Sequence, residues 1–456
     1  MRRALPATLG VVVAIGFRVP TWLSQVQLSY DDGVYGASVD LMASGMMPFR
    51  DFFSSQGPVF LPMLRGFDLL GLGELTAPRV AMMASGGLIA LATFWIVRRT
   101  ADALTAAAIS LVVGSSGLLL LAAGRLHSEG PAIALGLAAV AVAGAHVSSP
   151  TWRALAAGML IALALATKSL HLVPAAVAVF LILWRAGRGR SVLIGGVSAA
   201  VTGLVVSIPF GLDDVWDQYV LFHLDKSRAI DITDNVSGIH GLLWKHDLPI
   251  MVLVAIALLT LVVAPRRGST SDSLPTWIVW VWMGLGVGLL VFTQPILGGF
   301  ERFAAILIPP AALLASRAPV DRTILVVLAL IAVPYQWVAL SGTEVRHPDA
   351  VDLEVTAELV TIPSESYVVI DEPGLTWFSD RLSHPATVDS SFGRIGAGRM
   401  TPEILEMAIA DERTCAVVSW SGRFRSIGLD EAPAGFEKLW EQEDRFVAIK
   451  PDCLSG

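Results

Sequence analysis

Long apolar stretches separated by short polar segments fill the first 340 residues of the chain. A helix crosses the hydrocarbon core of a membrane in roughly 20 apolar residues, because its backbone polar groups are then all bonded within the helix. The pattern predicts eleven membrane spans, at about residues 5–23, 77–97, 103–123, 130–148, 153–168, 170–185, 191–210, 248–265, 275–293, 302–316 and 323–340. We interpret the first span as an anchor rather than a cleaved signal peptide, since it lacks a small-residue cleavage site before the acidic loop that follows.

Basic side chains predict the orientation of these spans, because arginine and lysine accumulate in cytoplasmic loops. With eleven spans, the basic clusters all fall on the side of the N-terminus; they are Arg2-Arg3, Arg98-Arg99, Arg153, Arg185 with Arg188 and Arg190, Arg266-Arg267, and Arg317 with Arg322. We therefore expect a multi-pass protein of the cell inner (cytoplasmic) membrane with a cytoplasmic N-terminus. The long connections lie on the opposite side, so the function is expected on the outer face.

The residues after the last span differ in composition from those before it. Residues 341–456 carry a net charge of −11, whereas the first 340 residues carry +4. The predicted fold is an all-α polytopic membrane bundle over residues 1–340, followed by a small extracytoplasmic α/β domain over residues 341–456. In that domain we expect strands at Tyr367–Asp371, Ala416–Trp420 and Arg445–Ile449, and a helix at Pro402–Ala410 with Thr401 as its N-cap.

Both cysteines of the chain, Cys415 and Cys453, fall in this C-terminal domain beside two of the predicted strands. On the oxidising side of the membrane a disulfide between them is plausible. Two free thiols in a small domain are an equally good interpretation of the sequence.

Composition excludes several classes of protein. The chain is 54% hydrophobic and 16% charged, whereas soluble globular chains carry about 25% charged residues. The net charge of −7 argues against nucleic acid as the main partner. The apolar spans imply that the protein contacts membrane lipid. We find no phosphate-binding P-loop, dinucleotide fingerprint, metal-spaced His/Cys cluster or serine-hydrolase elbow.

The first outer loop, residues 24–76, holds the most informative acids. Asp31 and Asp32 follow the first span closely, where carboxylates are costly unless they are exposed or used. They could accept a proton from a hydroxyl or hold a metal; the alternative is a solvated pair that caps a helix beginning near Gly33. We also expect surface helices at Val34–Met47 and Val59–Leu72, which would suit a substrate with a lipid tail.

A second acid, Glu129, stands at the start of the fourth span, two residues after His127. It is interpreted either as a second carboxylate of an outer cavity or as a helix cap that favours the helix dipole. Cations follow on the same predicted side, in a set that comprises Lys168, Arg302, His223, Lys226 and Arg228. Each by itself is more often an interface residue than a ligand, but together they would suit a phosphate-bearing lipid.

These features resemble the GT-C superfamily of integral-membrane glycosyltransferases, in the branch of protein O-mannosyltransferases and lipid A aminoarabinose transferases. The resemblance covers most of residues 25–316. It lies in Asp31-Asp32-Gly33-Val34-Tyr35, the Pro48–Phe53 and Pro58–Phe60 stretches, Thr167-Lys168, and the segment from Arg302 through Ile308-Pro309-Pro310 to Leu314.

The resemblance implies a reaction as well as a fold. A sugar would move from a polyprenyl-phosphate donor to a hydroxyl of a glycan, lipid or protein acceptor, by single displacement with inversion. Asp32 is the favoured general base, with Asp31 and Glu129 beside it, and the donor phosphate would meet Lys168 and Arg302 first, then His223, Lys226 and Arg228. Acceptor or sugar contacts are expected from Tyr35, Arg50, Asp51, Gln56, His127 and Glu301.

No cofactor is required by this interpretation, although a divalent cation is left open. Two other functions fit the same pattern. One is a ligase that moves a preassembled glycan from a lipid diphosphate, which would depend less on the acids of the first loop. The other is a transporter or flippase of lipid-linked sugars, although the chain shows no pair of similar halves of the kind that transporters often have.

Overall fold

The computed structural model describes residues 5–72, 75–145, 149–225, 231–263, 274–293, 300–317, 321–340 and 345–454. The chain forms two compact units, each assembled from three segments. We call them the bundle unit (Met1–Trp22, Ala81–Val206 and Arg228–Glu344) and the sheet unit (Leu23–Val80, Ser207–Ser227 and Val345–Gly456). The division predicted at residue 340 stays a prediction, since the sheet unit also takes in the first outer loop.

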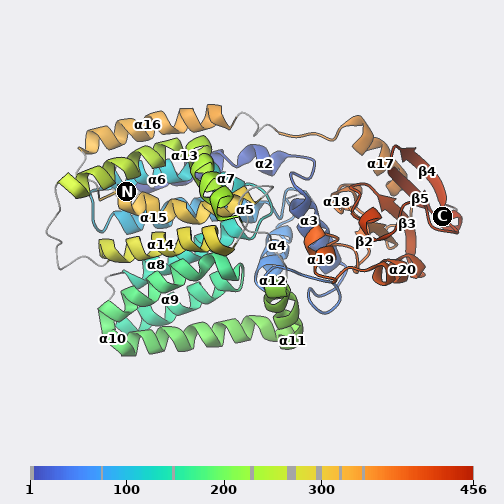
Figure 1. Ribbon diagram of the computed structural model, residues 1–456, viewed down its shortest axis with the longest axis horizontal. Helices are drawn as coiled ribbons and strands as arrows, with labels where there is room; N and C mark the ends of the chain where they lie inside the picture. Colours follow the sequence, from blue (N-terminus) through green and yellow to red (C-terminus); the bar gives the residue numbers. More distant parts are fainter. Residues whose placement is uncertain are drawn as a thin grey trace. The chain divides into compact units, whose positions relative to one another are not determined.

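The bundle unit is helical throughout its described residues (Figure 1). Its elements are α1 (Leu5–Gly16), α2 (Val19–Leu23), α5 (Val80–Val97), α6 (Ala103–Gly114), α7 (Gly117–Ala123), α8 (Glu129–Ala143), α9 (Pro150–Leu165), α10 (Ser169–Ser207), α13 (Ile232–Val263), α14 (Thr276–Thr293), the 3-10 helix η3 (Glu301–Leu307), α15 (Ile308–Ala315) and α16 (Arg322–Ala339).

Four helical stretches among the described residues are long and apolar enough to cross a membrane: Val80–Val97, Leu172–Phe210, Thr276–Thr293 and Arg322–Ala339. A fifth span results if α6 and α7, which meet at 59°, count as one bent span. Shorter apolar helices accompany them at Pro6–Gly16, Glu129–Ala143 and Pro150–Leu165. The protein is thus a multi-pass membrane protein, and the predicted number of eleven spans stays a prediction.

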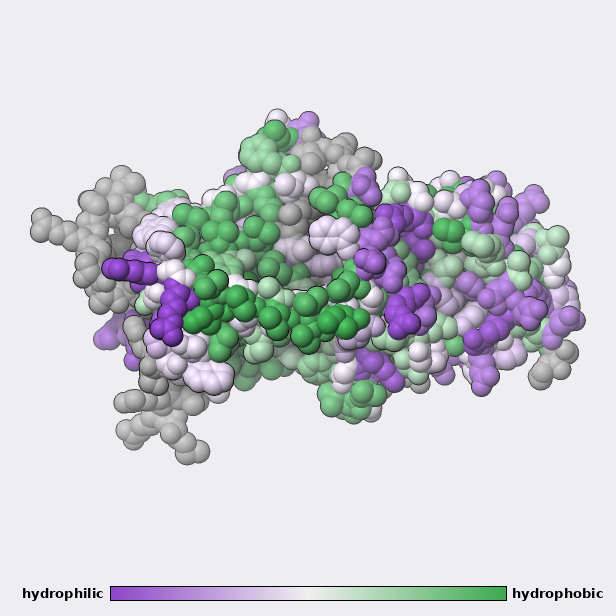
Figure 2. Space-filling model, turned by 90° about the horizontal axis from the view of Figure 1, so that it is seen from below, coloured by the Kyte–Doolittle hydropathy of each residue, from purple (hydrophilic) through white to green (hydrophobic). Residues whose placement is uncertain are grey.

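Helix α10 is broken in its middle. The backbone at Gly187 and Arg188 is not helical, and the break falls between the spans predicted at 170–185 and 191–210. After it, apolar side chains such as Leu193 and Val197 are exposed, at 67% and 55%. Figure 2 shows one such apolar face, as expected for helices whose surroundings are lipid rather than water.

The sheet unit surrounds a five-stranded sheet with the order β2-β1-β3-β5-β4. Strand β1 is parallel to β2 and β3, whereas β5 is antiparallel to β3 and β4. The strands are β1 (Tyr367–Ile370), β2 (Leu382–Ser383), β3 (Thr414–Ser419), β4 (Glu437–Gln442) and β5 (Arg445–Ile449). The three predicted strands are confirmed as β1, β3 and β5; β2 and β4 are too short or too polar to stand out in the sequence.

Helices complete the sheet unit. They are α3 (Tyr30–Ala43), α4 (Phe60–Asp68), α11 (Leu212–Val215), α12 (Phe222–Asp225), α17 (Ala350–Val360), α18 (Gly374–Ser379), α19 (Phe392–Gly396) and α20 (Pro402–Ala410), with one π-helical turn, η2 (Trp216–Leu221), and the 3-10 turns η1 (Ile208–Phe210), η4 (Arg425–Ile427) and η5 (Pro451–Cys453). Helix α20 has the predicted bounds, although Thr401 makes no side-chain capping bond.

The central strands read as continuous apolar runs because both faces of the sheet are covered. Val368 and Ile370 of β1 pack in one core with Val355 and Leu359 of α17. Val369 between them points to the other core, which contains residues of α20. This alternation explains why the pattern of β1 lacks the polar positions of a half-exposed strand.

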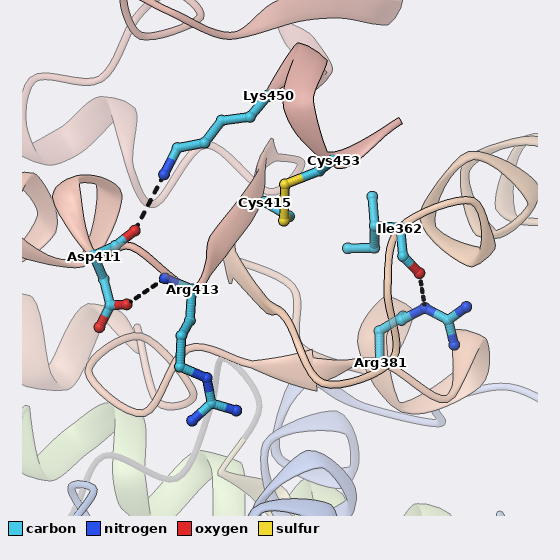
Figure 3. The surroundings of a disulfide bond; sticks show 7 residues. All are labelled: Ile362, Arg381, Asp411, Arg413, Cys415, Lys450 and Cys453. Atoms are coloured by element: carbon cyan, nitrogen blue, oxygen red, sulfur yellow. Dashed lines mark hydrogen bonds between the residues drawn. A yellow bond between two sulfur atoms is a disulfide. The ribbon is translucent and has the colours of Figure 1, made fainter. Parts of the chain in front are cut away.

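A disulfide joins Cys415 of β3 to Cys453 of η5, with 5.8 Å between their Cα atoms (Figure 3). The backbone N–H of Lys450 donates to the carbonyl of Cys415, which holds the end of β5 beside β3. Of the two interpretations of the sequence, the structure has the disulfide.

The first surface helix expected in the outer loop is not a surface helix. Helix α3 is buried along most of its length, from Asp32 to Val39, and it packs on α18 and β2 inside the sheet unit. The indole of Trp377 lies so close that a Cβ on Gly36 would come within 2.2 Å of it. Helix α4 fits the expectation better, since Leu69 and Leu70 at its end are exposed.

Candidate active site

Three charged residues from separate segments meet in the bundle unit. Glu129 begins α8, Lys168 lies in the turn between α9 and α10, and Arg302 lies in η3. Lys168 Nζ is 3.3 Å and Arg302 Nε is 3.5 Å from the same oxygen, Oε1, of Glu129. We call this group the Glu129 cluster. All three residues were predicted as site residues, and the tertiary structure brings them together.

The Glu129 cluster is shielded from water but not sealed. The side chain of Glu129 is 2% exposed, whereas those of Lys168 and Arg302 are 10% and 16% exposed. Both cations also lie against the ring of Phe303, at 5.7 and 5.3 Å from its centroid. The carboxylate and the two cations lie in surroundings that screen charge weakly, so charges there interact strongly.

The acid pair of the first loop lies in the sheet unit, in the first turn of α3. Asp32 is fully buried, and its Oδ2 accepts hydrogen bonds from Arg79 Nη2 at 2.6 Å and from the backbone N–H of Leu28 at 3.0 Å. Asp31 is only half-buried. The helix starts at Tyr30 with Ser29 as its N-cap, so the acids follow the cap rather than form it.

Arg79 is a neighbour of Asp32 that the sequence did not lead us to select. It is fully buried and donates to the carbonyls of Ser24 and Val26 as well as to Asp32. Its guanidinium lies 5.1 Å from the ring centroid of Trp377. The available signal was a charge inside the span predicted at 77–97, which needs a partner when it is buried.

The C-terminal residues of the sheet unit surround the start of α3. The guanidinium of Arg423 stacks on the ring of Tyr30 at 3.6 Å, and the Tyr30 hydroxyl lies 3.3 Å from Ser390 Oγ. Burial, together with the carboxylate of Asp389, raises the pKa of Tyr30 well above its ordinary value. The residue before Asp31 is therefore held by chain segments more than 350 positions away.

The remaining predicted residues are dispersed. His223 Nε2 is 2.8 Å from the carbonyl of Ser55, next to the buried Gln56. Tyr35 is buried with its ring edge on Phe60. Gln56 and Tyr35 are buried inside the sheet unit and His223 is half-buried; their role as ligands stays a prediction.

Four other predicted contacts lie closer to solvent or to the Glu129 cluster. Asp51 accepts the backbone N–H of Met47 at 2.7 Å, and Arg50 beside it is exposed. Glu301 precedes Arg302 in η3 and is half-buried. His127 is buried, with Nδ1 3.1 Å from the carbonyl of Leu121.

Two predicted phosphate contacts, Lys226 and Arg228, lie outside the described residues. Over the part of the chain that is described, no three His, Cys, Asp or Glu side chains are grouped so that they could hold a metal ion.

The fold itself has solved relatives. ArnT from Cupriavidus metallidurans in the apo state superposes with a TM-score of 0.69 at 14% identity, over 98% of this chain and 98% of that chain. The same protein bound to undecaprenyl phosphate gives a TM-score of 0.68 at 15% identity over the same shares. The apo oligosaccharyltransferase of Archaeoglobus fulgidus gives 0.56 at 11% identity, over 94% of this chain and 71% of that chain.

The chain has the GT-C fold. The fold that the resemblance implied is thereby confirmed. No family model and no curated protein matches the sequence. The GT-C fold was therefore recognisable from a few residues and from the structure, at an identity too low for overall sequence similarity to show it.

Proposed function

We propose that this protein is a glycosyltransferase that moves a sugar from a polyprenyl-phosphate donor to an acceptor hydroxyl on the outer face of the cytoplasmic membrane. The single observation that carries the proposal is the Glu129 cluster, in which Lys168 and Arg302 converge on one carboxylate within a GT-C bundle. It is supported by ArnT, which shares this fold along its whole length and binds undecaprenyl phosphate.

The Glu129 cluster is the proposed site of the donor phosphate. Departure of a lipid phosphate leaves negative charge that preplaced cations stabilise, most strongly where water is scarce. Arginine offers a forked donor and lysine a compact charge, which suits a phosphate approached from two sides. Glu129 keeps both cations in place before the donor arrives, and its shielding by the bundle keeps the local dielectric low.

We propose Asp31, rather than the favoured Asp32, as the general base. The Oδ2 atom of Asp32 already accepts two hydrogen bonds, and the side chain has no exposed surface through which a hydroxyl could reach it. Asp31 occupies the same first turn of α3 and is half-buried. Asp32 then serves to fix this turn through Arg79, so that the neighbouring acid has a defined position.

The proposed reaction is a single displacement. The acceptor oxygen forms a bond to the anomeric carbon while the bond from that carbon to the phosphate oxygen breaks. The hydroxyl proton passes to Asp31, and the lipid phosphate leaves with the electron pair of the broken bond. The transition state resembles an oxocarbenium ion, and attack opposite the leaving group inverts the anomeric centre. Atoms and electrons balance in this reaction without a cofactor.

The test uses the intact protein in lipid nanodiscs with a panel of polyprenyl-phosphate hexoses, pentoses and amino sugars. Release of polyprenyl phosphate that depends on an added acceptor extract, with a sugar of inverted configuration in the product, supports the proposal. Movement of donor across a liposome membrane without product would instead support a transporter. Accessibility of single cysteines at both ends of the chain tests the proposed orientation, with a cytoplasmic N-terminus.

A further inference from the structure

The short helix α7 (Gly117–Ala123) lies inside the bundle unit and packs on both η3 and α8. Arg302 belongs to η3, and Glu129 is the first residue of α8. A shift of α7 would therefore move two of the three elements that build the Glu129 cluster. The turn from α7 to α8 is also tied back to α7, through the contact of 3.1 Å between His127 Nδ1 and the carbonyl of Leu121.

The C-terminal end of α7 is held by a buried cation. Arg18 is 1% exposed, and its Nε and Nη2 donate to the carbonyls of Ala123 and Leu119 at 2.8 and 3.0 Å. Arg18 lies in the turn after α1, and its Nη1 donates to the carbonyl of Ala14 in that helix, at 2.7 Å. The last carbonyls of a helix carry the negative end of its dipole, so a cation there is favourable. Gly86 makes room, since a Cβ on it would lie 2.4 Å from Arg18 Nε.

The N-terminal end of α7 is held by a buried acid. Asp247 has no exposed surface, and its Oδ2 accepts the backbone N–H of Leu118 at 2.9 Å. It lies at the break in α13, where its backbone is not helical, with a φ of −141°. The break comes very close to α7, because a Cβ on Gly117 would lie 2.7 Å from the carbonyl of His246. The carboxyl oxygen of Asp247 thus accepts one of the N–H groups that the first turn of a helix leaves without a partner in the helix.

An isolated helix of seven residues is too short to be stable in water, so its place in the bundle depends on tertiary contacts. Burying a charge inside a membrane bundle is also costly. Two buried ionisable side chains, each hydrogen-bonded to one end of the same short helix, are explained together if they hold that helix. We propose that Arg18 and Asp247 are positioning residues that fix α7 and thereby the geometry of the Glu129 cluster. Their importance for donor binding rests on the proposed function.

The first test measures the reactivity of Lys168, which requires no substrate. The chain has five lysines, so amine labelling of the intact protein in nanodiscs is assigned readily by mass spectrometry. Arg18→Met and Asp247→Leu should raise the labelling rate of Lys168 at least about fivefold, as Glu129→Gln should, because the amine is then no longer held against the carboxylate of Glu129.

Conservative variants and a matched control distinguish a specific positioning effect from a general loss of folded structure. Asp247→Asn keeps an oxygen acceptor and should stay within about twofold of the wild type, while Arg18→Lys should be intermediate because it keeps fewer donors. Arg153→Met is the matched control. Arg153 donates to the carbonyl of Ala145 at 3.1 Å, just past the end of α8 opposite Glu129, and its loss should leave Lys168 unchanged.

The second test measures the affinity for undecaprenyl phosphate. Arg18→Met should weaken it about tenfold, but not further in a Lys168→Ala background, because residues that act through one site are not additive. Unchanged labelling of Lys168 in Arg18→Met and Asp247→Leu would overturn the inference, and so would wild-type affinity in Arg18→Met. The two measurements can also disagree. If the variants raise the labelling of Lys168 but the wild type does not bind undecaprenyl phosphate, the proposed function is rejected and the positioning role stands.

Discussion

The Glu129 cluster of the bundle unit and the Asp32–Arg79 pair of the sheet unit contain the same kinds of side chain. They differ in how the charges are paired and in how far the side chains are exposed. In the cluster, one carboxylate is shared by two cations at 3.3 and 3.5 Å, and both cations retain some exposed surface. In the pair, the two charged groups are 2.6 Å apart and fully buried. The cation of the pair is also bonded to two backbone carbonyls.

Charge balance and exposure distinguish a ligand site from a structural ion pair. A balanced, fully buried pair has no net charge to offer a ligand, and breaking it leaves an uncompensated charge in the interior. In the Glu129 cluster two cations meet one carboxylate, and both cations keep some exposed surface. By this criterion the bundle unit contains the proposed phosphate site, and the sheet unit contains a structural ion pair, Asp32–Arg79, that fixes the start of α3.

The largest expected effect separates the two neighbouring acids. Asp31→Asn should lower transfer by about 10² to 10⁴, the usual contribution of a general base, while leaving the thermal unfolding midpoint unchanged. Asp32→Asn should lower the unfolding midpoint instead, and its folded fraction should keep most of its activity. Rates per folded molecule, from the transfer assay and a thermal scan, decide between them. An inactive but stable Asp32→Asn, with an active Asp31→Asn, would return the base role to Asp32.

The second effect tests the buried pair directly. Arg79→Met should destabilise the protein by about 3–5 kcal/mol, because it leaves the carboxylate of Asp32 buried without its cation. Arg65→Met is the matched control, since Arg65 pairs with Asp68 one turn away on α4, where such pairs contribute about 0.5 kcal/mol or less. Denaturant unfolding in mild detergent measures both. Equal stability of the two variants would contradict a locking role for Arg79.

The third effect tests the Glu129 cluster. Lys168→Ala and Arg302→Ala should each reduce transfer by about 10- to 100-fold, because each removes one preplaced charge from the departing phosphate. Lys245→Ala and Arg98→Ala, which change exposed cations of the same unit, are the controls. Steady-state rates at saturating acceptor are the measurement. Full activity in both cluster variants would exclude this group as the phosphate site.

The smallest effect concerns pH and only the sheet unit. Burial lowers the pKa of His384, although Asp411 raises it in part. The unfolded chain then binds more protons than the folded one below about pH 6.5, so the free energy of unfolding should fall as the pH falls, by less than about 1.4 kcal/mol per pH unit.

The control for this effect is His384→Gln, which should show a flatter pH dependence of stability. Glu372 acts in the opposite direction at lower pH, because burial raises its pKa. The difference between wild type and variant isolates the histidine. Parallel stability profiles of the two proteins between pH 7.5 and 5 would show that His384 does not carry the dependence.

The sequence by itself determined the parts of this protein that depend on neighbouring residues. Long apolar runs predicted the membrane helices, and short apolar runs predicted β1, β3 and β5. Both predictions work because the burial of a helix or strand is reflected in the apolar residues along a continuous stretch of chain. Position next to a span was also enough to select Glu129, Lys168 and Arg302 as candidates. An outer loop and a few cations were enough to suggest the GT-C fold.

Only the tertiary structure decided which charges meet. Arg79 reaches Asp32 across 47 positions, and Arg18 reaches Ala123 across 105. No local pattern encodes such partners, because an ion pair depends on where two distant segments pack and on how much water that packing removes. For the same reason the difference between Asp31 and Asp32, adjacent and chemically identical, lies in their burial and in the partners that tertiary packing gives to Asp32.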